Sequence, residues 1–233
     1  IAERPTEYEI EIKEEDSYEI LLVGGGGGGG MDGAGGGGAG EVVYYSNRTA
    51  NWKTGGEITL QPGTYVVRIG AGGNNAQSIN VNGTDGGITA LYKKSNMNTP
   101  VLRAGGGGGG GSKQIPYWWP YTSGQGNQGS GGGPGAPGHN WWYHTSTPSV
   151  ANGGDSSQPG MSWGYAASAG GSGSTQAISA NGWDSGWREA GLAAGSRDID
   201  ITGRSVLYGG GGAGGSWAWL NPANTAEQPG GNG

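Results

Sequence analysis

The chain opens on a strict alternation of acidic and apolar residues. Residues 7–12 read Glu-Tyr-Glu-Ile-Glu-Ile, a polar stretch follows at residues 14–17, and residues 18–23 are largely apolar. Alternation with a period of two is typical of a β-strand with one face in solvent. We therefore expect a β-hairpin over residues 7–23 that turns at residues 14–17.

Short apolar runs predict further strands along the chain. These strands are expected at residues 41–45, 57–60, 65–69, 79–81, 88–93, 100–103, 198–202 and 205–208. Residues 61–64, Gln-Pro-Gly-Thr, carry proline and glycine in the central positions of a tight turn between two of them. The only helical signal covers residues 187–194 and is interrupted by Gly191. The pattern predicts a mainly β and irregular chain with almost no α-helix.

Three of the apolar runs lead directly into glycine, at residues 24–30, 105–111 and 209–212, and glycine supplies 58 of the 233 residues. Glycine loses the most conformational freedom on folding and adds no side chain to a core. An ordered chain of this kind must gain stability from backbone hydrogen bonds between segments, and the polyproline-II helix leaves its backbone groups free for them. We predict a small antiparallel β region plus a polyglycine-II helix sandwich, with an aliphatic core only in the first half.

The character of the chain changes near residue 112, where bursts of tryptophan and tyrosine begin to alternate with glycine-rich spacers. We expect three parts. Residues 1–23 form an acidic hairpin suited to attachment, and residues 24–111 form a β and glycine-rich scaffold. Residues 112–233 form a glycine-rich recognition region with aromatic loops.

Charge and cysteine content exclude several classes of partner. The net charge is −6 and the acid is densest near the N-terminus, so a basic patch for nucleic acid is not expected. The absence of cysteine rules out disulfides and thiolate metal sites. No apolar run approaches the roughly 20 residues of a membrane span, so membrane insertion is not expected. The start at Ile1, without a signal-peptide pattern, suggests a processed or partial chain.

Motifs for catalysis and metal binding are weak. Residues 160–164 match the G-x-S-x-G pattern, but a nucleophile elbow needs a following helix and a later histidine, whereas His139 and His144 both precede Ser162. Two histidines without cysteines or a carboxylate cluster do not complete a zinc site. Asp198 and Asp200 offer only a weak calcium site. We predict no enzymatic activity, no cofactor and no bound metal.

Residues 18–111 resemble the glycine-rich domain of bacteriophage tail fibres and related tail proteins. The resemblance is carried by a hydrophobic strand that runs into polyglycine (residues 20–30), by two strands joined through Pro-Gly (residues 58–67), and by the return of polyglycine after another short strand. The second half is similar to the receptor-recognition tip of T-even-type phage fibres, where glycine-rich motifs build a polyglycine sandwich and variable loops contact the host.

The resemblance implies an adhesin without catalytic activity at the distal end of a tail fibre. Such a protein is part of the virion and acts at the outer surface of the host cell. Its partners would be a host surface receptor, either an outer-membrane protein or a glycan, and other fibre subunits.

The aromatic bursts are the candidate receptor-binding site. Tryptophan and tyrosine are effective anchors in binding loops, although each tryptophan also buries about 200 Å² and would serve equally to cover the glycine scaffold. The candidate residues are Tyr117, Trp118, Trp119, Tyr121, His139, Trp141, Trp142, Tyr143, His144, Trp163, Trp183 and Trp187.

Other functions remain open from sequence. One is a purely structural virion component whose aromatic loops pack against neighbouring subunits. Another is an ice-binding bundle of glycine helices, for which we would expect a regular tripeptide repeat that the chain does not have. A depolymerising tailspike would need paired carboxylates in a cleft, and the acidic residues here are alternating or scattered.

Overall fold

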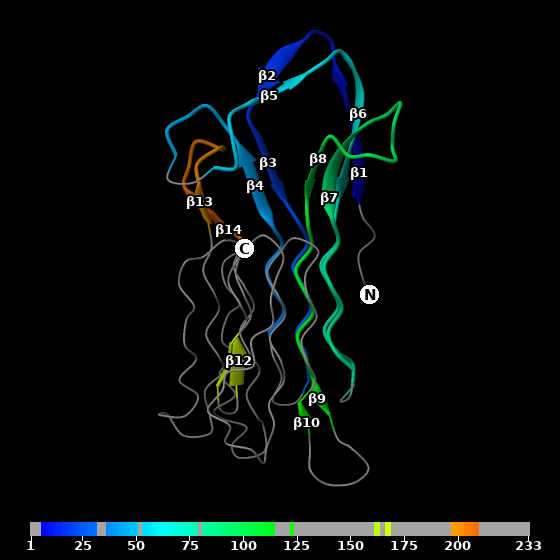
Figure 1. Ribbon diagram of the computed structural model, residues 1–233, viewed down its shortest axis with the longest axis vertical. Helices are drawn as coiled ribbons and strands as arrows, with labels where there is room; N and C mark the ends of the chain where they lie inside the picture. The colour runs from blue at the N-terminus through cyan, green and yellow to red at the C-terminus, as the bar shows by residue number, and fades with distance from the viewer. Residues whose placement is uncertain are drawn as a thin grey trace.

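The computed structural model describes residues 6–31, 36–50, 53–78, 81–114, 122–123, 161–163, 166–168 and 197–209. Most of the strands gather at one end of the molecule, and glycine-rich segments run from them toward the other end (Figure 1). No helix occurs in these ranges. The mainly β character expected from the sequence is therefore confirmed for this part of the chain.

The four-stranded antiparallel sheet has the order β1-β6-β7-β8, and the other strands form two-stranded pairs. The strands of the sheet are β1 (Thr6–Ile12), β6 (Gly63–Ile69), β7 (Thr89–Lys93) and β8 (Leu102–Ala104). The pairs are β2 (Asp16–Tyr18) with β5 (Ile58–Leu60), β3 (Ile20–Val23) with β4 (Val42–Tyr45), β9 (Lys113–Gln114) with β10 (Thr122–Ser123), β11 (Met161–Trp163) with β12 (Ala166–Ser168), and β13 (Arg197–Ile199) with β14 (Val206–Tyr208).

The hairpin expected over residues 7–23 is wrong. β1 pairs with β6, and β2 pairs with β5, so the chain continues in one direction through residues 13–15 instead of reversing there. Residues 13–15 lie opposite residues 61–62, so this strand has one residue more than its partner, as in a β-bulge.

Ion pairs accompany the pairing of β1 with the distant strand. Glu7 forms an ion pair with Arg68 of β6 at 2.6 Å, and Glu9 forms one with Lys94 at 2.7 Å. In the expected hairpin these glutamates would have faced residues 18–23, which contain no cation. Opposite charges across strands stabilise a pairing, whereas an apolar partner leaves the carboxylate without one.

The pair β3–β4 is buried on both faces, so the structure has three layers. On one face, Leu22 and Val43 pack against Ala104 of the sheet. On the other face, Val42 packs against Ile199 of β13. This double burial explains why residues 20–23 and 42–45 are apolar at successive positions and do not alternate.

A second hydrophobic cluster adjoins the contact between β3–β4 and the four-stranded sheet. Its buried members are Ile12, Leu60, Tyr65 and Leu91. Strands separated by about 80 residues of sequence therefore share one core.

The expectation of a core confined to the first half is also wrong. Ile199 is 3% exposed and packs with the partly buried Ile201 and Tyr208 against β4. The short pair β13–β14 thus closes one face of β3–β4, because Val42 and Tyr44 would otherwise expose their side chains to water.

Five glycine-rich segments extend from these strands and lie side by side (Figure 1). We call residues 24–30 the central run. The second, third, fourth and fifth runs are residues 36–41, 70–76, 81–87 and 105–112. Backbone hydrogen bonds link the central run to each of the other four. The sequence predicts that the three glycine runs at residues 24–30, 105–111 and 209–212 are neighbours joined by backbone hydrogen bonds. This is confirmed for the first two, whereas residues 210–212 lie outside the described part of the chain.

The amides of the central run change partner with a three-residue period. Gly24 and Gly27 donate to carbonyls of the second run at 2.9 and 2.8 Å. Gly25 and Gly28 donate to carbonyls of the fourth run, both at 2.9 Å. Residues three apart therefore point toward the same neighbour.

The carbonyls of the central run follow the same period. Those of Gly25 and Gly28 accept from the fifth run at 2.9 and 2.8 Å, and those of Gly26 and Gly29 accept from the third run, both at 2.8 Å. The second and fourth runs also bond the fifth run at residues three apart. The glycine segments are thus tied to one another in several directions, unlike strands, which pair only in the plane of a sheet.

The runs approach too closely for side chains on most sides. A Cβ atom added at Gly27 would lie 2.1 Å from the carbonyl oxygen of Gly108, and one at Gly28 would lie 2.0 Å from that of Asn74. At Gly26, by contrast, the nearest atom would be 3.7 Å away. Glycine is required wherever a neighbouring backbone occupies the place of the side chain.

Candidate functional site

Most of the receptor-binding residues expected from sequence lie outside the described part of the chain. These are Tyr117, Trp118, Trp119, Tyr121, His139, Trp141, Trp142, Tyr143, His144, Trp183 and Trp187. Of Trp163 only the backbone is described, at the end of β11, where it pairs with Ala166 of β12. The site therefore remains a prediction.

The structure does place the two ends of one aromatic segment. The fifth glycine run continues into β9, and β9 pairs with β10, Gln114 opposite Thr122 and Lys113 opposite Ser123. Residues 115–121, which include four of the candidate aromatic residues, connect these paired strands. In Figure 1, β9 and β10 lie at the end of the glycine runs that is far from the sheet.

The G-x-S-x-G match has a local structure that differs from a nucleophile elbow. Ser162 lies in the middle of β11, opposite Ala167 of the antiparallel strand β12. An elbow needs a turn from a strand into a helix, and here a strand is paired with the strand that follows it.

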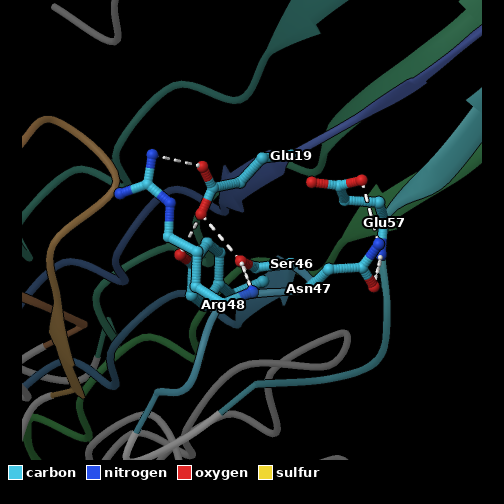
Figure 2. A network of polar contacts seen from close by, with 6 residues as sticks. Glu19, Ser46, Asn47, Arg48 and Glu57 are labelled. Atoms are coloured by element: carbon cyan, nitrogen blue, oxygen red, sulfur yellow. Dashed lines mark hydrogen bonds and ion pairs between the residues drawn. The ribbon is translucent and has the colours of Figure 1, made fainter.

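The best-defined polar cluster surrounds Glu19, between β2 and β3 (Figure 2). One carboxylate oxygen accepts hydrogen bonds from the hydroxyls of Tyr44 and Ser46, the latter at 2.8 Å. The other oxygen forms an ion pair with the Arg48 guanidinium at 3.1 Å. Tyr44 and Ser46 are fully buried, so these bonds satisfy hydroxyls that have no access to water.

The surroundings shift the pKa values of Glu19 and Tyr44 in opposite directions. The hydrogen bond from Tyr44 lowers the pKa of Glu19 below its ordinary value, with further lowering by Ser46 and Arg48 against the effect of burial. Burial raises the pKa of Tyr44, and the bond to Glu19 adds to it. A carboxylate held ionised by three protein donors is suited to a structural role and not to donating a proton.

The cluster fixes the loop between β4 and β5. The Lys53 ammonium donates to the carbonyls of Ser46 and Arg48, both at 3.1 Å. The side chain of Asn47 donates to Glu57 at 2.9 Å and accepts from the Glu57 amide at 3.2 Å (Figure 2). The loop is thereby held against the end of the strands by side chains.

Sequence reasoning did not identify this cluster. Its one signal is that Glu19 interrupts an otherwise apolar stretch between Tyr18 and Ile20. A single acidic residue among strand-forming neighbours indicates a buried partner, but the partners lie more than 20 residues away and follow no local motif.

Neither a metal site nor a membrane span is found where the structure is described. No group of three or more histidine, cysteine, aspartate or glutamate side chains in those ranges is arranged to hold a metal ion. Asp198 accepts a hydrogen bond from the Ser205 hydroxyl. The same part of the chain contains no helix with the length and hydropathy needed to cross a membrane.

A family model described as a glycine-rich domain matches residues 3–233. No curated protein and no solved structure matches the chain.

Proposed function

The chain belongs to the glycine-rich domain family, and on this premise we propose that it is the receptor-binding tip of a bacteriophage tail fibre. In this proposal it recognises a host surface receptor, an outer-membrane protein or a glycan, without catalysis. It acts on the virion, at the distal end of the fibre, and its second partner is another fibre subunit.

The observation that carries the proposal is the connection of a cross-bonded glycine bundle to an aromatic segment. The central run is hydrogen-bonded to four neighbouring runs, and the fifth run leads into the paired strands β9 and β10 that flank residues 115–121. Loops mounted on a rigid support bind with a small ordering cost, which favours affinity.

We further propose that the glycine runs are polyglycine-II helices packed as a sandwich. The three-residue period of the hydrogen bonds supports this, because a polyproline-II helix has three residues per turn and makes no internal hydrogen bonds. Lateral bonds in several directions are then the only way for its backbone groups to find partners.

The two ends of the molecule have different chemistry in this proposal. The sheet and the acidic strand β1 lie at one end, and β9 and β10 lie at the other (Figure 1). We assign attachment to the first end, within residues 1–23, and host recognition to the second. Trp118 and Trp142 are taken as representative anchors.

The test is to replace Trp118 and Trp142 by alanine in the full chain and to measure adsorption of the labelled protein to a panel of Gram-negative cells. Loss of a true anchor typically costs about 2 kcal/mol or more, so we expect adsorption to fall about 30-fold or more. The melting temperature is measured in parallel, because a tryptophan that covers the scaffold would lower stability and leave binding intact.

The control variant is Tyr8→Ala, which removes an exposed aromatic ring from the sheet end. It should leave adsorption unchanged. If the tryptophan variants adsorb normally but melt at a much lower temperature, the aromatic residues have the packing role of a structural virion component. If the unaltered chain adsorbs to no cell in the panel, the adhesin proposal is contradicted.

A further inference from the structure

β1 forms an open edge of the four-stranded sheet. In the described structure it pairs only with β6. Six of its seven residues, all but Ile12, are exposed to solvent. Natural proteins usually protect such an edge by shortening the strand or covering it, because its unpaired backbone groups accept another strand.

The two faces of this edge are chemically distinct. On one face, Tyr8 is 57% exposed and Ile10 is 45% exposed, and Ile69 of the neighbouring β6 is 43% exposed. These residues form an apolar strip, since Thr6 lies opposite Ile69 and Tyr8 follows on the same face. The other face carries the three glutamates at positions 7, 9 and 11.

Close to β1 the charged face has more acid than base, and the further cation Arg103 lies on the same face in β8, opposite Ala90 of β7. Glu7 and Glu9 are paired with Arg68 and Lys94, and all four side chains are substantially exposed. Glu11 lies opposite Thr64, which brings no charge. A strand added outside β1 would place alternate side chains next to these glutamates, and basic residues there would be stabilised by cross-strand attraction.

We infer that β1 is a docking edge for an extended segment of another protein, which adds to the sheet as a strand and alternates basic with apolar residues. Its basic side chains would lie beside Glu7, Glu9 and Glu11, and its apolar side chains beside Tyr8 and Ile10. Main-chain hydrogen bonds supply affinity and the alternating side chains supply specificity in this binding mode. The inference deepens the attachment role in the proposed function, because it states the chemistry of the subunit that would hold this end.

A second copy of the chain fits this edge poorly. In antiparallel pairing, residues directly opposite share a face. A register that keeps Tyr8 and Ile10 on the apolar strip therefore sets glutamate against glutamate on the other face. Any register shifted by one residue places glutamates on the apolar strip. Like charges directly opposite destabilise a pair, so a different, basic partner is favoured.

The test uses a synthetic heptapeptide of alternating lysine and valine with the full chain. We expect saturable binding by fluorescence anisotropy, together with slower amide exchange in residues 6–12. Two control peptides carry N-methyl groups on alternate residues. One is methylated at the lysine amides and the other at the valine amides. Strand addition uses only one set, so one control should bind and the other should not. Equal binding by both controls would mean charge attraction alone and would overturn the inference.

Matched variants distinguish peptide binding at the β1 edge from non-specific attraction between charges. Glu11→Lys should weaken peptide binding about fivefold or more, as should Ile10→Lys, whereas Glu14→Lys, with the same charge change at an exposed position beyond β1, should have little effect. Equal weakening by Glu11→Lys and Glu14→Lys would contradict the inference. So would a dimer in sedimentation that Ile10→Lys abolishes, since the occupant would then be a second copy. The peptide-binding test does not depend on adsorption to cells, so failure of the adhesin proposal would leave its outcome unaffected.

Discussion

Alanine at Gly27 is expected to lower the free energy of unfolding by about 3 kcal/mol or more, and valine at the same position is expected to prevent folding. The added Cβ would lie 2.1 Å from the carbonyl oxygen of Gly108 and 2.5 Å from its carbon. These are backbone atoms of a run that bonds to three others, so they cannot move aside as a flexible side chain would. Thermal or chemical unfolding of the purified variants measures the effect.

Gly26→Ala is the matched control, since it adds the same methyl group to the adjacent residue. Its nearest neighbour would be 3.7 Å away, an ordinary contact distance. We expect unchanged or slightly increased stability, because alanine restricts the unfolded chain more than glycine does.

A scan of alanine through residues 24–29 extends this comparison to the proposed helix type. Clashes of 1.9–2.1 Å are expected at residues 24, 25, 27 and 28, and ordinary contacts of 3.7 Å at residues 26 and 29. The loss of stability should therefore repeat every three residues. A period of two would indicate ordinary strands, and a uniform loss would mean that these positions are equally crowded; either result contradicts the polyglycine-II proposal.

The sequence was most informative about which segments become strands. Apolar runs at residues 41–45, 65–69 and 88–93 correspond to β4, β6 and β7 with ends shifted by one or two residues. Burial of apolar side chains decides these segments locally, and the same local reasoning shows that long glycine runs need neighbouring backbones.

The sequence was least informative about which strands pair. Residues 7–12 alternate as any half-exposed strand would, and alternation carries no information about the partner. The pairing with β6 brings Glu7 and Glu9 to Arg68 and Lys94, which are distant in sequence, and residues 20–23 are buried on both faces against other segments. The strand at residues 198–202 is predicted by its apolar run, but the contribution of Ile199 to the core is not, because its partners Val42 and Tyr44 are distant in sequence.

The two candidate sites, the aromatic segments and the cluster around Glu19, also differ in how far the sequence reveals them. The aromatic segments stand out by composition, yet composition does not distinguish a binding loop from a cover over the scaffold. The cluster around Glu19 has only the weak signal of a single acid in an apolar stretch, because its partners Tyr44, Ser46 and Arg48 have no distinctive sequence context. Its importance follows only from burial, which the fold creates.

Glu19→Gln is expected to lower the free energy of unfolding by about 2 kcal/mol at neutral pH. The neutral amide removes the ion pair with Arg48 and replaces charge-assisted bonds from the buried Tyr44 and Ser46 with weaker ones. Glu14→Gln is the control, since Glu14 is exposed, and it should change stability little. Urea unfolding of the three proteins measures the differences.

The pH dependence of stability gives an independent test of the same carboxylate. The pKa of Glu19 in the folded protein lies below the ordinary value of 4.5, so folding favours the ionised form. Its stabilising contribution is complete above pH 4.5 and is lost as the pH falls through the lowered folded-state pKa. The unaltered protein should therefore lose more stability than Glu19→Gln on acidification below pH 4.5, and the two curves should converge there. Parallel curves would show that Glu19 gains nothing from its ionisation in the folded state, which would contradict the role assigned to Tyr44 and Arg48 in holding it charged.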